Sequence, residues 1–197
     1  MPRVGIFAGT FDPVHTGHIT FALQAIDRAK LDEVMFVPER RPRAKPAAEH
    51  YGHRVAMLRR ALKPHARLSL LELVEGQFTV HRTLNHLRGI VGDAELVLLV
   101  GSDVLPHIPD WPHADQLLRE VELVVGVRAG ESPEAVGLRV ETWPVQPRKL
   151  TVFDSFAPVV SAGAVRQALR QRQMVAGVLS SVLRYSRQNW LYIALPN

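Results

Sequence analysis

The sequence predicts an α/β fold built on a doubly wound parallel sheet. Short runs rich in Val, Leu and Ile alternate with amphipathic segments along the chain, which is typical of βα units. A length of 197 residues and an apolar content of 47% allow one substantial core. No long Gly/Ser or charged linker and no internal repeat divides the chain. We therefore expect residues 1–197 to form a single domain.

The apolar runs predict strands at about 3–8, 33–38, 67–73, 94–101, 121–127 and 149–153. Apolar residues spaced three or four apart predict helices between them, at about 17–29, 51–62, 80–91 and 113–119. A region before the last strand is rich in turn-forming residues, namely Pro133, Gly137, Pro144 and Pro147. Two more helices, at about 161–171 and 178–188, form a C-terminal helical subregion.

The composition limits the chemistry of the chain. The absence of cysteine excludes disulfides, thiolate zinc sites and cysteine nucleophiles. A formal charge of +5 favours anionic partners, although charge does not distinguish a nucleotide from a nucleic acid. No apolar run approaches the roughly 20 residues of a membrane-spanning helix, and the N-terminus lacks the pattern of a signal peptide. We expect a cytoplasmic location and no membrane partner.

The most informative segment, residues 9–18, follows the first strand and reads GTFDPVHTGH. In an open parallel sheet, ligands bind beyond the carboxyl ends of the strands. Gly9 permits a tight turn there, and Gly17 permits close approach of a ligand to the backbone. If the helix begins near this point, the three-residue spacing places His15 and His18 on one face, at a helix N-terminus that favours anions. Phosphoryl and nucleotidyl transfer depend on such positioned donors.

The two histidines alone leave other interpretations open. A zinc site would need one or two further ligands, which the spacing does not assign. The histidines could also be ordinary polar residues near a helix start. The complete decapeptide favours a phosphate, because its glycines, Thr10, Pro13 and paired histidines all fit around one. The Gly-x-x-x-x-Gly-Lys-Ser/Thr loop is absent, which excludes a P-loop ATPase. The motif Gly-x-Gly-x-x-Gly does not follow the first strand, which excludes a conventional dinucleotide-binding enzyme.

The decapeptide resembles the signature of the HxGH nucleotidyltransferase superfamily, and the chain is most similar to the nicotinate mononucleotide adenylyltransferases. The similarity continues along nearly the whole chain, through residues 45, 52–58, 101–103, 111, 121–128 and 189–192. The resemblance implies a Rossmann-like fold and transfer of AMP from ATP to nicotinate mononucleotide, with release of pyrophosphate. It implies a Mg²⁺ cofactor bound mainly through the ATP phosphates, with no protein residue assigned as its ligand. An oligomer is compatible with the sequence, and no nucleic-acid partner is expected.

The resemblance also assigns individual residues. It implies catalytic roles for Thr10, His15 and His18 at the ATP phosphates. It extends the ATP site to Gly9, Phe11, Gly101, Asp103, Ser161 and Arg166. It gives the acceptor site Lys45, which would hold the acceptor's phosphate, with Thr83 and Trp111. Two of these have other interpretations, since Asp103 could cap the next helix and Trp111 could be a core aromatic residue.

Two departures from the family pattern keep alternatives open. Residues 160–166 read VSAGAVR where the family usually has Ile-Ser-Ser-Thr-x-Ile-Arg, so two hydroxyl donors are lost. Residues 78–84 read FTVHRTL where the family tends to have Tyr-Thr-x-Asp-Thr-Leu, which affects the acceptor pocket. The alternatives are adenylyl or cytidylyl transfer to another phosphorylated acceptor such as phosphopantetheine, and a non-catalytic module that binds nucleotides or RNA. A cluster of Arg40, Arg41, Arg43 and Lys45 could clamp an acceptor phosphate or form a solvated basic loop.

Overall fold

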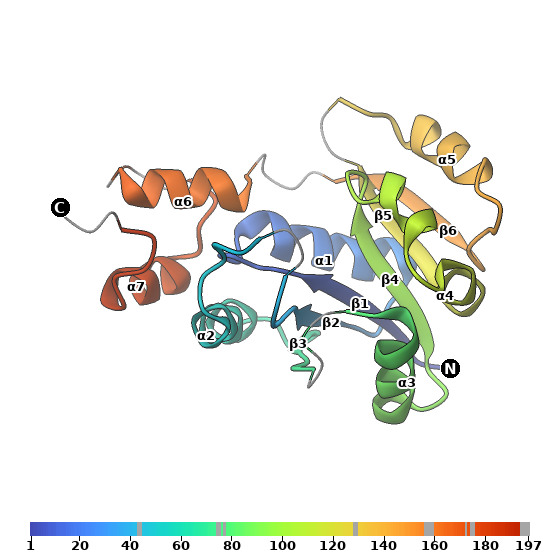
Figure 1. The fold of residues 1–197 in the computed structure, drawn as a ribbon, viewed down its shortest axis with the longest axis horizontal. Helices are drawn as coiled ribbons and strands as arrows, with labels where there is room; N and C mark the ends of the chain where they lie inside the picture. The colour runs from blue at the N-terminus through green and yellow to red at the C-terminus, as the bar shows by residue number, and fades with distance from the viewer. Residues whose placement is uncertain are drawn as a thin grey trace.

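The centre of the computed structural model is a six-stranded sheet in the order β3-β2-β1-β4-β5-β6, in which every neighbouring pair is parallel (Figure 1). The structure describes residues 1–42, 45–73, 76, 78–127, 130–155, 160–171, 173 and 176–193. The strand order confirms the predicted doubly wound sheet. The order reverses between β1 and β4, and a crevice at such a reversal, outside the carboxyl ends of the strands, is where this architecture binds ligands.

The elements follow one another as βα units. The strands are β1 (Arg3–Gly9), β2 (Glu33–Pro38), β3 (Leu68–Leu70), β4 (Glu95–Gly101), β5 (Glu122–Val127) and β6 (Leu150–Asp154). The helices of the sheet region are α1 (Thr16–Ala29), α2 (Tyr51–Leu62), α3 (Val80–Val91), the short 3-10 helix η1 (Leu105–Asp110), α4 (Ala114–Glu120) and α5 (Pro133–Glu141). Two helices close the chain, α6 (Ala162–Arg170) and α7 (Ser180–Gln188).

Apolar side chains alternate between the two faces of the sheet. In β4, Leu96 and Leu98 belong to one core while Val97 and Leu99 belong to the other. The helices α1, α2, α6 and α7 contribute to the core on the second of these faces, and α3, α4 and α5 to the core on the first. No helix within the described part of the chain is long and apolar enough to cross a membrane.

The structure corrects two predictions. The turn-rich region holds α5, because Ser132 caps the helix with its side chain, which accepts a hydrogen bond from the Ala135 N–H at 3.1 Å. Pro133 occupies a first-turn position, where proline is tolerated, and Val136 and Val140 are buried four residues apart. The strand expected at 67–73 is shorter and spans only Leu68–Leu70, at the edge of the sheet.

The C-terminal helices lie to one side of the sheet, next to α2 (Figure 1). The Tyr185 hydroxyl on α7 is 3.0 Å from Nδ1 of His53 on α2, and the guanidinium of Arg60 lies 4.2 Å from the centre of the Tyr185 ring. The predicted C-terminal helical subregion is therefore present and packs on the body of the protein.

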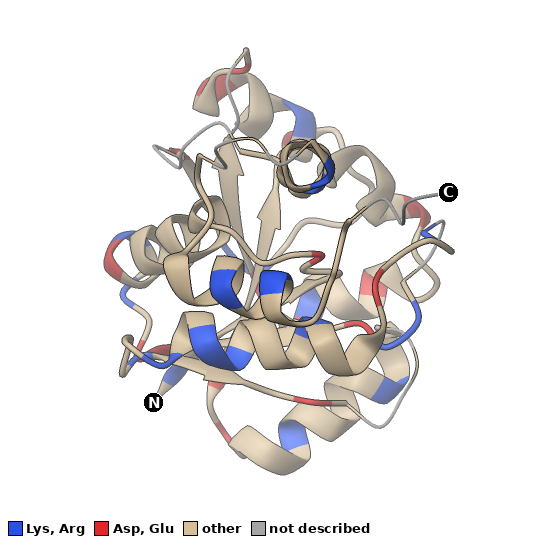
Figure 2. Ribbon diagram, turned by 90° about the vertical axis from the view of Figure 1, so that its left-hand side faces the viewer, with Lys and Arg blue, Asp and Glu red and all other residues tan. Residues whose placement is uncertain are grey.

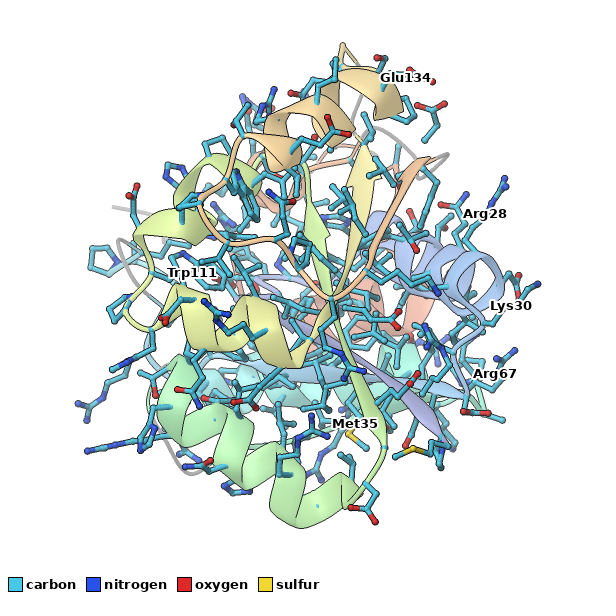
Figure 3. All side chains as sticks on the ribbon, turned by 90° about the vertical axis from the view of Figure 1, so that its right-hand side faces the viewer. Arg28, Lys30, Met35, Arg67, Trp111 and Glu134 are labelled. Atoms are coloured by element: carbon cyan, nitrogen blue, oxygen red, sulfur yellow. The ribbon has the colours of Figure 1, made fainter. Side chains whose placement is uncertain are left out.

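Figure 3 places Trp111, which follows β4 and η1, across the molecule from Arg28 and Lys30 at the far end of α1.

Candidate active site

The loop between β1 and α1, residues 10–15, brings the two predicted histidines together. His15 is the N-cap of α1 and His18 lies in its first turn. Their rings are stacked, with centroids 3.7 Å apart and an interplanar angle of 25°. The His15 backbone N–H donates to Nδ1 of His18 at 3.2 Å. Because Nδ1 is the acceptor, a neutral His18 carries its ring proton on Nε2, which makes Nε2 a donor.

Aromatic rings surround the His18 imidazole. The Phe11 ring meets it edge to face, with centroids 5.1 Å apart, and the Phe7 ring lies 5.9 Å away. Phe11 is buried and adopts a left-handed φ of 49°. A Cβ at Gly9 would come within 3.1 Å of the Phe11 ring, so the glycine gives that ring room over the strand end. Gly9 and Phe11, both predicted in the ATP site, therefore shape the surroundings of His18.

Thr10 and Lys45 meet at the ends of neighbouring strands. Lys45 follows β2, and its Nζ donates to Oγ1 of Thr10 at 3.2 Å. The backbone N–H of Arg41 donates to the carbonyl of Gly76 at 2.6 Å, and the guanidinium of Arg40 covers the Tyr51 ring at 4.4 Å. Arg43, the remaining arginine of the predicted basic cluster, lies outside the described residues.

Arg54 joins the β1–α1 loop to the loop between β2 and α2. The sequence places it in a helix and in the run 52–58 that is similar to the family, but assigns it no role of its own. The side chain is fully buried, with 1% relative exposure, and desolvation by burial lowers the pKa of its guanidinium. It donates to four backbone carbonyls at 2.6–3.3 Å, those of Thr10, Glu39, Arg40 and Glu49. An arginine four residues before Leu58, on the apolar face of α2, is the sequence signal that could have identified it.

Asp12 is a second buried residue that accepts hydrogen bonds from several parts of the chain. Its Oδ1 accepts from the Tyr192 hydroxyl at 2.6 Å, and its Oδ2 accepts from the Glu49 backbone N–H at 3.2 Å. Arg166 on α6 donates to the Asp12 backbone carbonyl at 2.6 Å and lies 3.8 Å from Oδ2. Burial raises the pKa of Tyr192, and the Asp12 carboxylate raises it further, which keeps the phenol protonated as a donor. Ser161 caps α6 by accepting from the Ala164 N–H at 3.1 Å.

A pocket of about 300 Å³ lies beside the segment that follows β4. Its lining residues come from the start of α3 and from the turn before α4, namely Phe78, Thr79, Val80, His81, Arg82, Trp111, Pro112 and His113. The rings of Phe78 and Trp111 are 6.3 Å apart. Thr83 is fully buried, and its Oγ1 accepts from the Thr79 N–H at 3.0 Å, so Thr79 and not Thr83 lines the pocket. Asp103, two residues after Gly101 at the end of β4, is exposed.

Glu39 links this pocket to the β1–α1 loop. Its backbone N–H donates to the Gly9 carbonyl at 3.0 Å, and its carboxylate accepts from the Phe78 N–H at 3.4 Å. Two hydrogen bonds of Glu39 therefore connect Gly9, at the end of β1, to Phe78 in the wall of the pocket.

The electrostatics of this region favour anions. The helices α2, α6 and α7 carry seven arginines and no acidic residue, and Figure 2 shows the basic positions on the helices that face the viewer. Clustered charge of one sign attracts oppositely charged ligands. The described residues contain no group of three or more His, Asp or Glu side chains arranged to hold a metal ion.

The comparisons with known proteins cover nearly the whole chain. The cytidylyltransferase-like family model matches residues 6–168. The nicotinate-nucleotide adenylyltransferase of Bacillus subtilis is 30% identical over 198 residues, which are 98% of this chain and 99% of that protein. A Bordetella petrii protein, named as a probable nicotinate-nucleotide adenylyltransferase, is 31% identical over 98% of this chain and 100% of its own length. Among solved structures, Plasmodium falciparum nicotinic acid mononucleotide adenylyltransferase complexed with NaAD has a TM-score of 0.80 at 16% identity and covers 98% of both chains.

Proposed function

The chain belongs to the cytidylyltransferase-like family and, within it, to the nicotinate-nucleotide adenylyltransferases, and from this membership we propose that it transfers AMP from ATP to nicotinate mononucleotide. An oxygen of the acceptor's 5′-phosphate attacks the α-phosphorus of ATP and forms a new P–O bond. The bond from the α-phosphorus to the bridging oxygen breaks, and pyrophosphate leaves. The products are the deamidated dinucleotide and pyrophosphate.

The contact between Lys45 and Thr10 is the observation that supports this reaction best. Nucleotidyl transfer needs two phosphates side by side, one attacking and one being attacked. Lys45 is proposed to hold the acceptor's phosphate and Thr10 the phosphates of ATP, and their side chains are 3.2 Å apart. Phosphates bound at the two residues would therefore be neighbours, in the arrangement that the attack requires.

The histidine pair supplies donors where negative charge develops. His15 and His18 lie at the N-terminus of α1, where the helix dipole favours phosphate. We assign His18 to the α-phosphate and to the departing pyrophosphate, since its Nε2 carries the ring proton. Ser161 and Arg166, at the start of α6, complete the triphosphate site.

Two further parts of the site receive the rest of the substrates. The nicotinate ring is proposed to enter the pocket between Phe78 and Trp111, whose size and aromatic walls suit a flat heterocycle. Gly101 and Asp103, after β4, are proposed to contact the adenosine. Thr83 supports the acceptor pocket through Thr79. Mg²⁺ would be held mainly by ATP oxygens and water and would neutralise charge on the leaving group.

An acceptor panel tests the proposal. Purified protein with Mg-ATP is given nicotinate mononucleotide, its amide, phosphopantetheine or buffer alone, and pyrophosphate release is measured. We expect release with nicotinate mononucleotide and little with buffer. Release only with phosphopantetheine would reassign the acceptor, and binding of ATP without release on any acceptor would indicate a non-catalytic module. The cytoplasmic location and an oligomeric state stay predictions from the sequence.

A further inference from the structure

We propose that Asp12 and Tyr192 form a positioning pair through which the C-terminal subregion holds the β1–α1 loop and Arg166 in the geometry that transfer needs. The inference rests on the proposed function, because the loop carries Thr10 and His15. Neither member of the pair is assigned a contact with substrate. The two residues are 180 positions apart in the sequence, and their side chains are joined by a buried hydrogen bond of 2.6 Å.

The surroundings of Asp12 show that the contact is built into the fold. Three segments distant in sequence converge on this residue, through the Tyr192 hydroxyl, the Glu49 backbone N–H and the Arg166 guanidinium. Asp12 and Tyr192 are both more than nine-tenths buried. A buried carboxylate is stable only when hydrogen-bonded, so loss of one donor leaves an oxygen that must find another partner.

The turn after α7 aims Tyr192 at the loop. The Leu191 N–H donates to the Ser186 carbonyl at 2.9 Å and the Trp190 N–H to the Arg187 carbonyl at 3.3 Å, the pairing of a Schellman motif. Trp190 and Tyr192 have left-handed φ values of 55° and 61°. Such conformations are costly for bulky residues and persist where surrounding contacts fix them. The Tyr192–Asp12 hydrogen bond is one contact that fixes this turn.

A second contact reaches the same loop from the C-terminal subregion. The Thr16 N–H, directly after His15, donates to the Gly177 carbonyl at 2.8 Å. Gly177 has a φ of 76°, and a Cβ there would come within 2.2 Å of Val160. The chain before α7 is thus fitted closely against the start of α1, so both sides of the loop are held by the last quarter of the sequence.

The pair of Asp12 and Tyr192 is proposed to affect catalysis through Arg166. One of the terminal nitrogens of Arg166 donates to the Asp12 carbonyl and lies 3.8 Å from Oδ2, while about a third of the side chain is exposed. Without the Tyr192 hydroxyl, the Asp12 carboxylate would draw the guanidinium toward itself and away from a phosphate. The defect should therefore fall on ATP more than on the acceptor.

Tyr192→Phe tests the proposal, with Tyr185→Phe as a matched control. Both variants lose one phenol hydrogen bond made by the C-terminal subregion, but Tyr185 bonds to His53, away from the loop. For Tyr192→Phe we expect kcat/KM for ATP to fall by about ten-fold or more, with a much smaller change in KM for nicotinate mononucleotide. Affinity for α,β-methylene-ATP, which cannot transfer AMP, should fall as well. The control should keep wild-type kinetics at a comparable melting temperature.

A double-mutant cycle with Asp12→Asn completes the test. If the two residues act as one unit, the double variant loses little more ATP affinity than the worse single variant. ATP parameters of Tyr192→Phe equal to those of Tyr185→Phe would overturn the proposal, and so would fully additive losses in the cycle. Failure of the proposed function would be recognised separately, because the wild-type protein would then bind the ATP analogue but release no pyrophosphate with any acceptor.

Discussion

At the scale of single residues, His18 carries the proposed chemistry. We expect His18→Ala to reduce kcat by about 10²–10³-fold, because a preorganised donor at developing charge is lost. The substitution also removes the acceptor for the His15 N–H, so unfolding should become easier by about 1 kcal/mol, as for the loss of a helix cap. Steady-state kinetics and thermal unfolding of the same preparation measure both effects.

His50→Ala is the matched control for this change. His50 caps α2 by accepting from the Gly52 N–H at 3.3 Å, and no substrate role is assigned to it. The control should lose a similar amount of stability and keep its turnover. Wild-type rates in His18→Ala would remove His18 from the mechanism.

Lys45 should affect the two substrates unequally. Lys45→Ala is expected to raise KM for nicotinate mononucleotide by about ten-fold and KM for ATP by less, since one charge-assisted hydrogen bond to the acceptor's phosphate is lost. The contact with Thr10 makes some effect on ATP expected. Initial rates over a grid of both substrate concentrations separate the two constants, with Lys63→Ala, an exposed lysine after α2, as the control. Equal increases in both constants would contradict the assignment.

At the scale of elements, the turn after α7 contains a residue poorly suited to it. Trp190 occupies the left-handed position where Gly is preferred, and the residue is 76% exposed. Trp190→Gly should stabilise the fold by about 0.5–1 kcal/mol, because relief of the left-handed conformation outweighs the entropy that Gly loses. Trp190→Ala retains a Cβ and should gain nothing. Chemical denaturation gives both values, and a destabilised Gly variant would mean that the indole contributes to the fold.

The elements that sequence analysis predicted are those with strong local signals. The helices α1, α2 and α3 appear where periodic apolar residues predicted them, and the strands β1, β2, β4, β5 and β6 appear where apolar runs predicted them. The helix α5 was missed because Pro133 and Gly137 suggest turns, whereas the Ser132 cap and the burial of Val136 decide the outcome. The His15–His18 pairing followed from helical spacing. The contacts of Asp12 could not be predicted, because they join residues up to 180 positions apart and depend on how the C-terminal helices return to the sheet.

At the scale of the whole molecule, binding groups gather at the carboxyl ends of the strands and a network of charges lies at the amino ends. Arg3 on β1 binds the Glu122 carboxylate of β5 through two nitrogens, at 2.6 and 3.1 Å, and also pairs with Glu95 of β4. Lys149 lies 3.7 Å from the same Glu122 carboxylate. The network therefore joins the strand β4 to its neighbours β1 and β5, at the end of the sheet away from the proposed site.

This network makes the stability of the fold depend on pH. The hydrogen bond from Arg3 lowers the pKa of Glu122 below its ordinary value of about 4.3. A carboxylate with a lowered folded-state pKa contributes stability above the ordinary value and loses it as the pH falls through the folded-state value. Glu122→Gln should therefore cost about 1–2 kcal/mol at pH near 7, and the difference from wild type should shrink below pH of about 4.

Urea denaturation of both proteins across this pH range measures the difference directly, because the linear extrapolation gives a free energy of unfolding at each pH. Glu72→Gln is the matched control, since its pair with Arg59 is partly exposed, with the Arg59 side chain 65% and the Glu72 side chain 33% exposed, and should contribute within about 0.5 kcal/mol. A constant difference between wild type and Glu122→Gln from neutral to acid pH would show that packing of this side chain, and not its charge, joins the three strands. A difference that vanishes in acid would place the stabilisation in the Arg3–Glu122 pair. Activity at neutral pH should be the same in wild type and Glu122→Gln, because the network lies at the amino ends of the strands and touches none of the residues assigned to the substrates.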